Sequence, residues 1–366
     1  MKEPSLLIMI ITVFLSPAWA TSLELQEDLI KIQKQYDLPS LSAAVIQNGE
    51  LKEIASAGVR KLGFPNKVTV DDKAHIGSCA KSMTATLAAS IIEENKLSWR
   101  TTIQELFPKL KVHSKLKNLS FDMLLAHRTG LRSNMEELYD VLSNEELTLT
   151  NRRKSAVKTI LEKGPQHTPG EYNYSNLGYV TVGHILERIT GKSFETLITE
   201  KLFLPLGMKS CGFGPTSSKL ATSPKQPWGH QENDNKLNPV HADNPIAISP
   251  AGTIHCSLKD WGKYLSIHVD GFNGIKKLIS LASFKKLHTL YPADKSDYTF
   301  GGWVRVKRSW AKGAAFHHAG TNTFNYANVW IAPKLKTIFM STTNVMKNGH
   351  AATDKAMGFM MKRHLK

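Results

Sequence analysis

The chain has 366 residues, of which 41% are hydrophobic, so it is long enough for one large core or two subdomains. Its formal net charge is +16, and from Gly271 onward there are 16 Lys and Arg residues against 3 Asp and Glu residues. No zinc-finger spacing or RNA-binding aromatic motif accompanies this charge, so we expect no nucleic-acid partner. Three cysteines without a repeated spacing argue against a disulfide scaffold, and the sequence leaves open whether Cys211 and Cys256 pair.

Residues 1–20 have the pattern of a signal peptide. Lys2 provides a basic start, Leu6 to Leu15 is a compact apolar run, and Ala18-Trp19-Ala20 supplies the small-residue cleavage pattern. An uncleaved anchor is the alternative, although the apolar run is short for a membrane span. We therefore expect a mature chain of residues 21–366 that is periplasmic or secreted and has no integral membrane segment.

Strands are predicted at both ends of the mature chain. Leu41 to Val45 and Leu51 to Ala57 flank the dipeptide Asn48-Gly49, and this pattern predicts a β-hairpin. Further strands are predicted at residues 302–307, 314–318, 326–331 and 337–342, followed by a final helix at residues 351–365.

The middle of the chain reads as helical. Helices are expected directly after Ser78 and at residues 121–126, 176–189, 197–202 and 258–269. Residues 219–250 are polar and contain prolines, which predicts a long surface excursion. The sequence thus predicts an α+β protein in which one sheet is built from residues 21–70 and 250–366. The helical region at about residues 75–249 is then an insertion in a single domain.

The stretch Ser78-Cys79-Ala80-Lys81 is the first candidate for chemistry. Serine and lysine three positions apart lie on the same face of a helix. A serine hydroxyl needs a nearby base to become a nucleophile, and burial lowers the pKa of a lysine so that its amine becomes useful. The same spacing recurs at Ser114, Ser155 and Ser283, but only the copy at Ser78 runs into a long apolar stretch. A helix cap with a solvated lysine is the structural alternative.

Two later stretches add polar groups. Tyr174 and Asn176 flank a small residue in a turn-rich segment that leads into a helix. A tyrosine near cations ionises more easily and serves as a general base, and an asparagine can hold a substrate amide. His318 precedes Gly320 and Thr321 at the end of a strand. Gly320 permits close approach of a ligand, and the backbone N–H of Thr321 is a candidate oxyanion donor. Each stretch alone also fits an ordinary loop.

The order of these three stretches, S-x-x-K, Y-x-N and H-x-G, resembles the serine β-lactamase-related family. This family includes class C β-lactamases, D,D-peptidases, D-aminopeptidases and esterases, and S-x-x-K is also a signature of penicillin-binding proteins. The segment Leu124 to Leu131, which reads LLAHRTGL, is similar to the family's LLxHxxGL segment. The resemblance extends from about Leu38 to the final helix.

The resemblance implies a β-lactamase/transpeptidase-like fold, with a mainly antiparallel sheet flanked by helices, an all-α region and an active site between them. It implies that Ser78 forms the acyl-enzyme, that Lys81 orients Ser78 and shares its proton, and that Tyr174 shuttles protons. Asn176 would contact the substrate amide or the lysine. The backbone N–H groups of Ser78 and Thr321 would form the oxyanion hole.

His318 departs from the pattern of class C β-lactamases, which carry a lysine at the matching position. Histidine is mostly neutral at neutral pH, so we do not expect strong β-lactamase activity. A peptidase or an esterase remains compatible with H-x-G. The sequence has no G-x-S-x-G nucleophile elbow, no H-E-x-x-H and no convincing zinc spacing, so we expect no metal and no cofactor.

The sequence therefore predicts an exported serine hydrolase that cleaves an ester or amide through a Ser78 acyl-enzyme. The activity would be of the D,D-peptidase, D-aminopeptidase or esterase type, on a small-molecule or peptide substrate. The alternative is a catalytically weak scaffold or sensor that binds cell-wall fragments with the same fold. The acyl donor, the acyl acceptor and the oligomeric state stay open.

Overall fold

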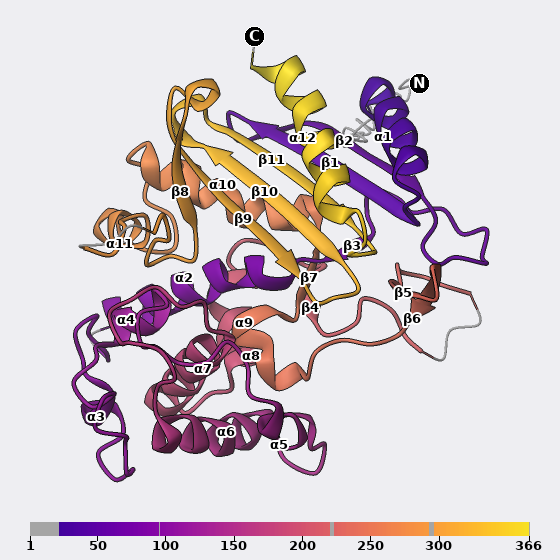
Figure 1. Cartoon of the computed structure of the whole chain (residues 1–366). Helices are drawn as coiled ribbons and strands as arrows, with labels where there is room; N and C mark the ends of the chain where they lie inside the picture. The colour runs from indigo at the N-terminus through magenta and orange to yellow at the C-terminus, as the bar shows by residue number, and fades with distance from the viewer. Residues whose placement is uncertain (1–21, 95, 220–222, 293–295, 366) are drawn as a thin grey trace, which may run out of the picture.

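The computed structural model describes residues 22–94, 96–219, 223–292 and 296–365, so the predicted signal peptide lies outside the described residues. The main strands are β1 (Ser40–Gln47), β2 (Glu50–Gly58), β8 (Val304–Arg308), β9 (Gly313–Thr321), β10 (Tyr326–Ala332) and β11 (Thr337–Thr343). They form a 6-stranded antiparallel sheet in the order β2-β1-β11-β10-β9-β8 (Figure 1).

The sheet joins the two ends of the chain, as the sequence predicts. β1 lies between β2 and β11, with Ser42 opposite Thr342. The predicted hairpin of β1 and β2 is confirmed, and Asn48 (φ 55°) and Gly49 (φ 78°) form its turn. Positive φ at both positions is what a two-residue hairpin turn of this kind requires.

Helices cover both faces of the sheet. Helices α1 (Leu23–Gln35) and α12 (Gly349–His364) lie side by side on one face, and α10 (Leu258–Phe272) covers the other (Figure 1). Alternate residues of β1 serve the two cores: Val45 packs with the α1 and α12 side, and Ile46 packs with the α10 side.

Helix α1 differs from the prediction, which assigned the residues from about 21 onward to the sheet. Leu25, Leu29 and Ile32 recur at helical spacing and are buried, and the Ser22 hydroxyl caps the helix by accepting from the Leu25 N–H. The apolar face of this helix is buried against β1, β2 and α12.

The all-α region is inserted between β2 and β8. Its centre is α2 (Ala80–Glu93), which is buried along almost its whole length because small side chains such as Ala85 and Ala88 let neighbouring elements approach. The other helices are α3 (Ile103–Leu106), α4 (Phe121–Leu125), α5 (Tyr139–Ser143), α6 (Leu149–Lys163), α7 (Asn176–Thr190), α8 (Phe194–Ile198), α9 (Ser249–Gly252) and α11 (Leu281–Leu287).

The predicted surface excursion at residues 219–250 is more ordered than expected. Among its described residues, β5 (Gly229–Asn233) and β6 (Lys236–Val240) form a hairpin. Asp234 (φ 49°) and Asn235 (φ 60°) form the turn, and both residue types tolerate left-handed backbone. The excursion then runs to α9, which lies beside α2.

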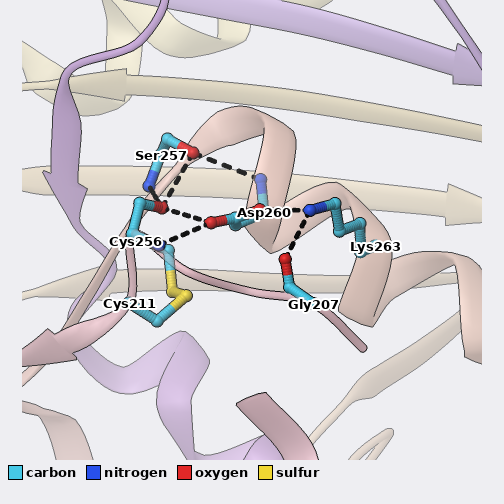
Figure 2. The surroundings of a disulfide bond; sticks show 7 residues. Gly207, Cys211, Cys256, Ser257, Asp260 and Lys263 are labelled. Carbon is cyan, nitrogen blue, oxygen red and sulfur yellow. Dashed lines mark hydrogen bonds and ion pairs between the residues drawn. A yellow bond between two sulfur atoms is a disulfide. The ribbon is translucent and has the colours of Figure 1, made fainter. Parts of the chain in front are cut away.

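A small sheet joins the two layers. It contains β3 (Lys73–His75), β7 (Ile254–Ser257) and β4 (Gly212–Phe213), in the order β3-β7-β4. A disulfide between Cys211 and Cys256, the pair that the sequence left open, fixes β7 to the turn before β4 (Figure 2). Within the part of the chain that the structure describes, no helix has the length and apolar character needed to cross a membrane.

Candidate active site

The predicted nucleophile lies where the sheet meets the all-α region. Ser78 sits in a 3-10 turn, Gly77–Cys79, that leads directly into α2, and its side chain is partly exposed. Lys81 follows one turn later and is fully buried, with its Nζ 3.2 Å from Ser78 Oγ. The structure thus confirms the helical placement of this serine and lysine, and it excludes a solvated lysine at position 81.

The Lys81 amine is held by three oxygen atoms. Its Nζ lies 2.7 Å from Asn176 Oδ1, 2.7 Å from the Ala251 carbonyl oxygen and 3.2 Å from Ser78 Oγ. Burial lowers the pKa of Lys81 to about 7. Amide and carbonyl oxygens only accept, so a neutral amine keeps donating to Asn176 and Ala251 and presents its lone pair to Ser78. This arrangement directs the Lys81 amine toward the Ser78 hydroxyl.

Tyr174 contacts Ser78 but is not the phenolate that the sequence suggested. Burial raises the pKa of Tyr174 well above its ordinary value, although a hydrogen bond with Ser78 opposes the rise. The Lys81 Nζ lies 4.8 Å from the centre of the Tyr174 ring, over its face. The phenol is therefore neutral, and it suits a proton relay better than a permanent base.

Asn176 serves the lysine, which is one of the two contacts expected for it. It is the first residue of α7, and its Nδ2 donates to Asn134 Oδ1 at 3.0 Å. Asn134 was not predicted as a site residue, because it lies in an irregular segment without a motif. The chain from Asn134 to Asn176 to Lys81 fixes the direction of the amine.

Two glycines bring β9 against the nucleophile turn. A Cβ atom at Gly320 would lie 2.1 Å from the Ile76 carbonyl oxygen and 2.8 Å from the Ser78 nitrogen. A Cβ atom at Gly77 would lie 2.3 Å from the Thr321 nitrogen. The predicted close approach at Gly320 is therefore to the chain's own turn, and it places the backbone nitrogens of Ser78 and Thr321 near each other. Their role as an oxyanion hole stays a prediction.

His318 is buried beside an aromatic cluster that includes His127, Tyr174 and Tyr298. Its Nδ1 donates to the Ala319 carbonyl oxygen at 2.6 Å, so its Nε2 accepts from the Tyr298 hydroxyl at 3.3 Å. Burial, followed by the positive charge of Lys81, lowers the pKa of His318 to about 3. His318 is thus neutral, as the sequence predicts, and it provides no fixed cation.

His127 belongs to the same aromatic cluster and was missed as a site residue. Its ring centre lies 4.4 Å from that of Tyr174 and 4.8 Å from that of Tyr298. Its Nδ1 accepts from the Ser175 N–H at 3.0 Å, and its backbone is left-handed (φ 58°). The LLxHxxGL segment was the available signal, and its histidine supports the loop that carries Tyr174.

A cleft of about 630 Å³ opens beside Ser78. Tyr174, Asn176 and Thr321 also line it, so these predicted site residues meet at one place, whereas His318 lies behind them. Among the described residues of its wall, Glu136 carries the only charged side chain. The described residues contain no group of three His, Cys, Asp or Glu side chains able to hold a metal ion.

A family model described as Beta-lactamase matches residues 25–358. The chain belongs to the β-lactamase family. Penicillin-binding protein 4 of Amycolatopsis lactamdurans is 25% identical over 247 residues, which cover 67% of this β-lactamase-family chain and 63% of that protein. The penicillin-binding protein PbpX of Bacillus subtilis is 24% identical over 309 residues, covering 84% and 71%. Unguisins hydrolase ungD' of Aspergillus campestris is 26% identical over 254 residues, covering 66% and 46%. The chain thus spans less than two thirds of the length of two of these three relatives.

Solved structures agree with the family assignment. The octameric penicillin-binding protein homologue from Pyrococcus abyssi has a TM-score of 0.76 at 21% identity, over 93% of this chain and 78% of that chain. The D-amino acid amidase from Ochrobactrum anthropi SV3 has a TM-score of 0.73 at 19% identity, over 93% and 99%. These similarities establish the β-lactamase/transpeptidase-like fold for this β-lactamase-family chain, as the sequence predicts.

Proposed function

We propose that this β-lactamase-family chain is an exported serine hydrolase that cleaves an ester or amide through an acyl-enzyme on Ser78. The proposal depends on one observation, which is the position of the Lys81 amine. This amine is buried, its Nζ lies 3.2 Å from Ser78 Oγ, and its pKa is lowered to about 7. A structural lysine has no need of such a position, because burying an ammonium group without a counter-charge is costly.

The geometry supports a two-step reaction. The Ser78 hydroxyl proton passes to the neutral Lys81 amine while Oγ attacks the carbonyl carbon, and the developing oxyanion lies between the N–H groups of Ser78 and Thr321. Tyr174, hydrogen-bonded to Ser78, donates its phenol proton to the leaving group as the bond between that group and the acyl carbon breaks, and the proton on Lys81 then restores the phenol. Water then attacks the acyl carbon, and the bond between that carbon and Ser78 Oγ breaks. The water proton passes through Tyr174 and Lys81 to Oγ, which releases the acid and restores the Ser78 hydroxyl.

The charges of the cleft favour a substrate with a free amine over one with a carboxylate. His318 is neutral, and Lys81 donates to three oxygens, so neither supplies a free cation for a carboxylate. Glu136, by contrast, offers a carboxylate, and the exposed ring of Tyr139 on the same wall suits an ammonium group. An amide or ester of an amino acid with a free amine fits this wall. The structural similarity to a D-amino acid amidase supports the D configuration.

Export is supported by two observations. Residues 1–20 have the composition of a signal peptide, and the Cys211–Cys256 disulfide fits an oxidising compartment such as the periplasm or the cell exterior.

The test is covalent labelling of the purified protein by a fluorophosphonate, followed by hydrolysis assays with D-alanine p-nitroanilide and its N-acetylated form. We expect labelling at Ser78, complete loss in Ser78→Ala, and preserved labelling in Ser114→Ala, which alters a second S-x-x-K copy that is exposed. We expect the free amine to be preferred over its acetylated form, and the preference to fall about 5-fold or more in Glu136→Gln. A folded protein that takes no label would overturn the proposal and favour the scaffold or sensor.

A further inference from the structure

A buried histidine and aspartate lie directly behind the nucleophile turn. His75 Nε2 lies 2.9 Å from Asp243 Oδ2, and the two side chains are only 1% and 3% exposed. The other ring nitrogen, Nδ1, accepts a hydrogen bond from the Gly77 N–H at 3.2 Å. Because Nδ1 accepts, Nε2 carries the proton and donates it to the carboxylate. His75 therefore connects Asp243 to the backbone that presents Ser78.

The second oxygen of the same carboxylate holds the other side of the site. Asp243 Oδ1 accepts from Asn322 Nδ2 at 2.9 Å, and Asn322 directly follows Thr321. The side-chain oxygen of Asn322, Oδ1, accepts from the Phe324 N–H at 3.2 Å and from Asn325 Nδ2 at 3.1 Å. Asn322 is only 3% exposed, so these bonds fix the backbone at the end of β9.

We propose that Asp243, through His75 and Asn322, positions both backbone donors of the oxyanion hole. This inference rests on the proposed function. We call His75, Asp243 and Asn322 the Asp243 clasp. One oxygen holds the turn of Ser78 and the other holds the end of the strand at Thr321, so a single carboxylate sets the separation of the two N–H groups.

The clasp also reaches the rim of the cleft. Asp243 Oδ1 accepts from the Asn244 N–H at 2.7 Å, and Asn244 and Pro245 line the cleft beside Ser78. The clasp thus joins three segments that are distant in the sequence and that border the site. His75 and Asp243 do not line the cleft, and Asn322, which does, is only 3% exposed and uses its side-chain amide to bond Asp243, Phe324 and Asn325, so the members of the clasp are positioning residues.

The clasp needs a carboxylate rather than an amide. In the Asp243→Asn variant, one amide oxygen must serve both His75 and Asn322, or the amide NH₂ must face one of them. If it faces His75, the imidazole has to accept at Nε2 and carry its proton at Nδ1, which then opposes the Gly77 N–H. A donor facing a donor in a buried site is costly, so the turn of Ser78 is expected to shift.

The test separates positioning from stability. The Asp243→Asn variant is compared with Asp260→Asn, which alters another buried carboxylate that accepts from Ser210 and Lys263. Figure 2 shows Asp260 beside Lys263, and neither residue is among those that line the cleft. The His75→Gln variant is compared with His255→Gln, because His255 is buried opposite His75 on β7 and bonds instead to the Gly214 carbonyl oxygen. Four quantities are measured: kcat and KM for an ester, the affinity for a phenylboronic acid, and the unfolding midpoint.

A boronic acid bound to Ser78 is tetrahedral, so its affinity reports the oxyanion donors rather than substrate binding. We expect Asp243→Asn to lower kcat and boronate affinity in parallel by about 10- to 100-fold with little change in KM. Asn322→Ala should show a smaller parallel loss, and it serves as the second variant if Asp243→Asn does not fold. Asp260→Asn and His255→Gln should lower the unfolding midpoint while keeping the boronate affinity.

Three outcomes overturn the inference in different ways. A wild-type protein that neither takes the fluorophosphonate nor binds the boronate overturns the proposed function, and the clasp with it. A reactive wild type whose affinity for the boronate is unchanged in Asp243→Asn and Asn322→Ala overturns the clasp alone. The clasp is also overturned if the control variants lose boronate affinity as strongly as the clasp variants do.

Discussion

The Lys81 amine is the single group whose environment most changes its chemistry. It is fully buried and touches three oxygen atoms, and its ordinary pKa falls to about 7. Below that pH the amine is protonated and cannot take the Ser78 proton. Above it the lone pair is free, and the two other oxygens hold it in the direction of the serine.

We therefore expect kcat/KM of the acylation reaction to rise with pH through about 7, because the fraction of neutral Lys81 rises, and then to level off. The Lys81→Arg variant keeps its charge at every accessible pH and should lose about 100-fold or more. The Tyr174→Phe variant should be slower but keep the same midpoint, because the pKa of Tyr174 lies far above this range. Stopped-flow acylation at a series of pH values measures all three. A midpoint that moves in Tyr174→Phe would contradict the role of Lys81.

The sequence predicts the site as far as its motifs reach. Ser78, Lys81, Tyr174, Asn176 and Thr321 stand in short patterns whose chemistry can be reasoned from residue type, and the structure brings them to one cleft. Residues outside such patterns were not predicted, since nothing local marks them. These are Asn134, Asp243 and His75, whereas His127 stands in the LLxHxxGL segment and its contact with the Tyr174 loop needed the structure. The ionisation of Tyr174 was predicted in the wrong direction, because burial raises the pKa of its phenol more than the hydrogen bond with Ser78 lowers it, and sequence does not show burial.

At the scale of elements, the contact between β9 and the turn that carries Ser78 depends on two glycines, which have no side chain. Gly320 and Gly77 face each other's backbone at distances that no Cβ atom tolerates. Strand β9 and the turn that carries Ser78, more than two hundred residues apart in sequence, thus meet so closely that neither backbone has room for an added side chain. The position of Thr321 relative to Ser78 follows from this contact.

The Gly320→Ala variant is expected to lose stability by about 1–3 kcal/mol, because its Cβ would overlap the Ile76 carbonyl oxygen, and to lose acylation almost completely. Gly358→Ala is the matched control. It lies inside α12, where an added Cβ meets nothing within 4 Å, and it should gain about 0.5–1 kcal/mol by helix propensity. Urea unfolding and fluorophosphonate labelling measure the two effects. Normal labelling of Gly320→Ala would show that the contact is dispensable.

Much of the element pattern was predictable. The hairpin of β1 and β2, the strands β9 to β11, and helices α7 and α10 follow from alternation, helical spacing and caps. Helix α6 was not predicted, because its buried face includes Arg153, which is charged yet paired with Glu187 and Glu195 in the interior. The hairpin of β5 and β6 was missed because its strands are polar and lack an apolar face.

At the scale of the whole molecule, the disulfide connects distant parts of the helical insertion. Cys211 and Cys256 are 45 positions apart, and Cys256 lies on β7 beside β3, the strand that leads to the nucleophile turn. The bond restricts the unfolded chain more than it restricts the folded one.

Replacing both cysteines by serine is expected to lower the free energy of unfolding by about 2–4 kcal/mol, and a reductant should destabilise the wild type by a similar amount. The remaining thiol, Cys79, is buried, so it should react with a thiol reagent only after denaturation. Guanidinium unfolding with and without reductant measures the first effect, and thiol titration measures the second. A wild type that is insensitive to reductant would contradict the presence of the bond.

The position of β1 between β2 and β11 has a consequence for synthesis. Its partner β11 begins at Thr337, so a nascent chain that has not yet reached that strand leaves one edge of β1 without hydrogen-bond partners. Closure of the sheet must therefore wait until translation has passed Thr343. Until then the nascent chain exposes the unpaired edge of β1.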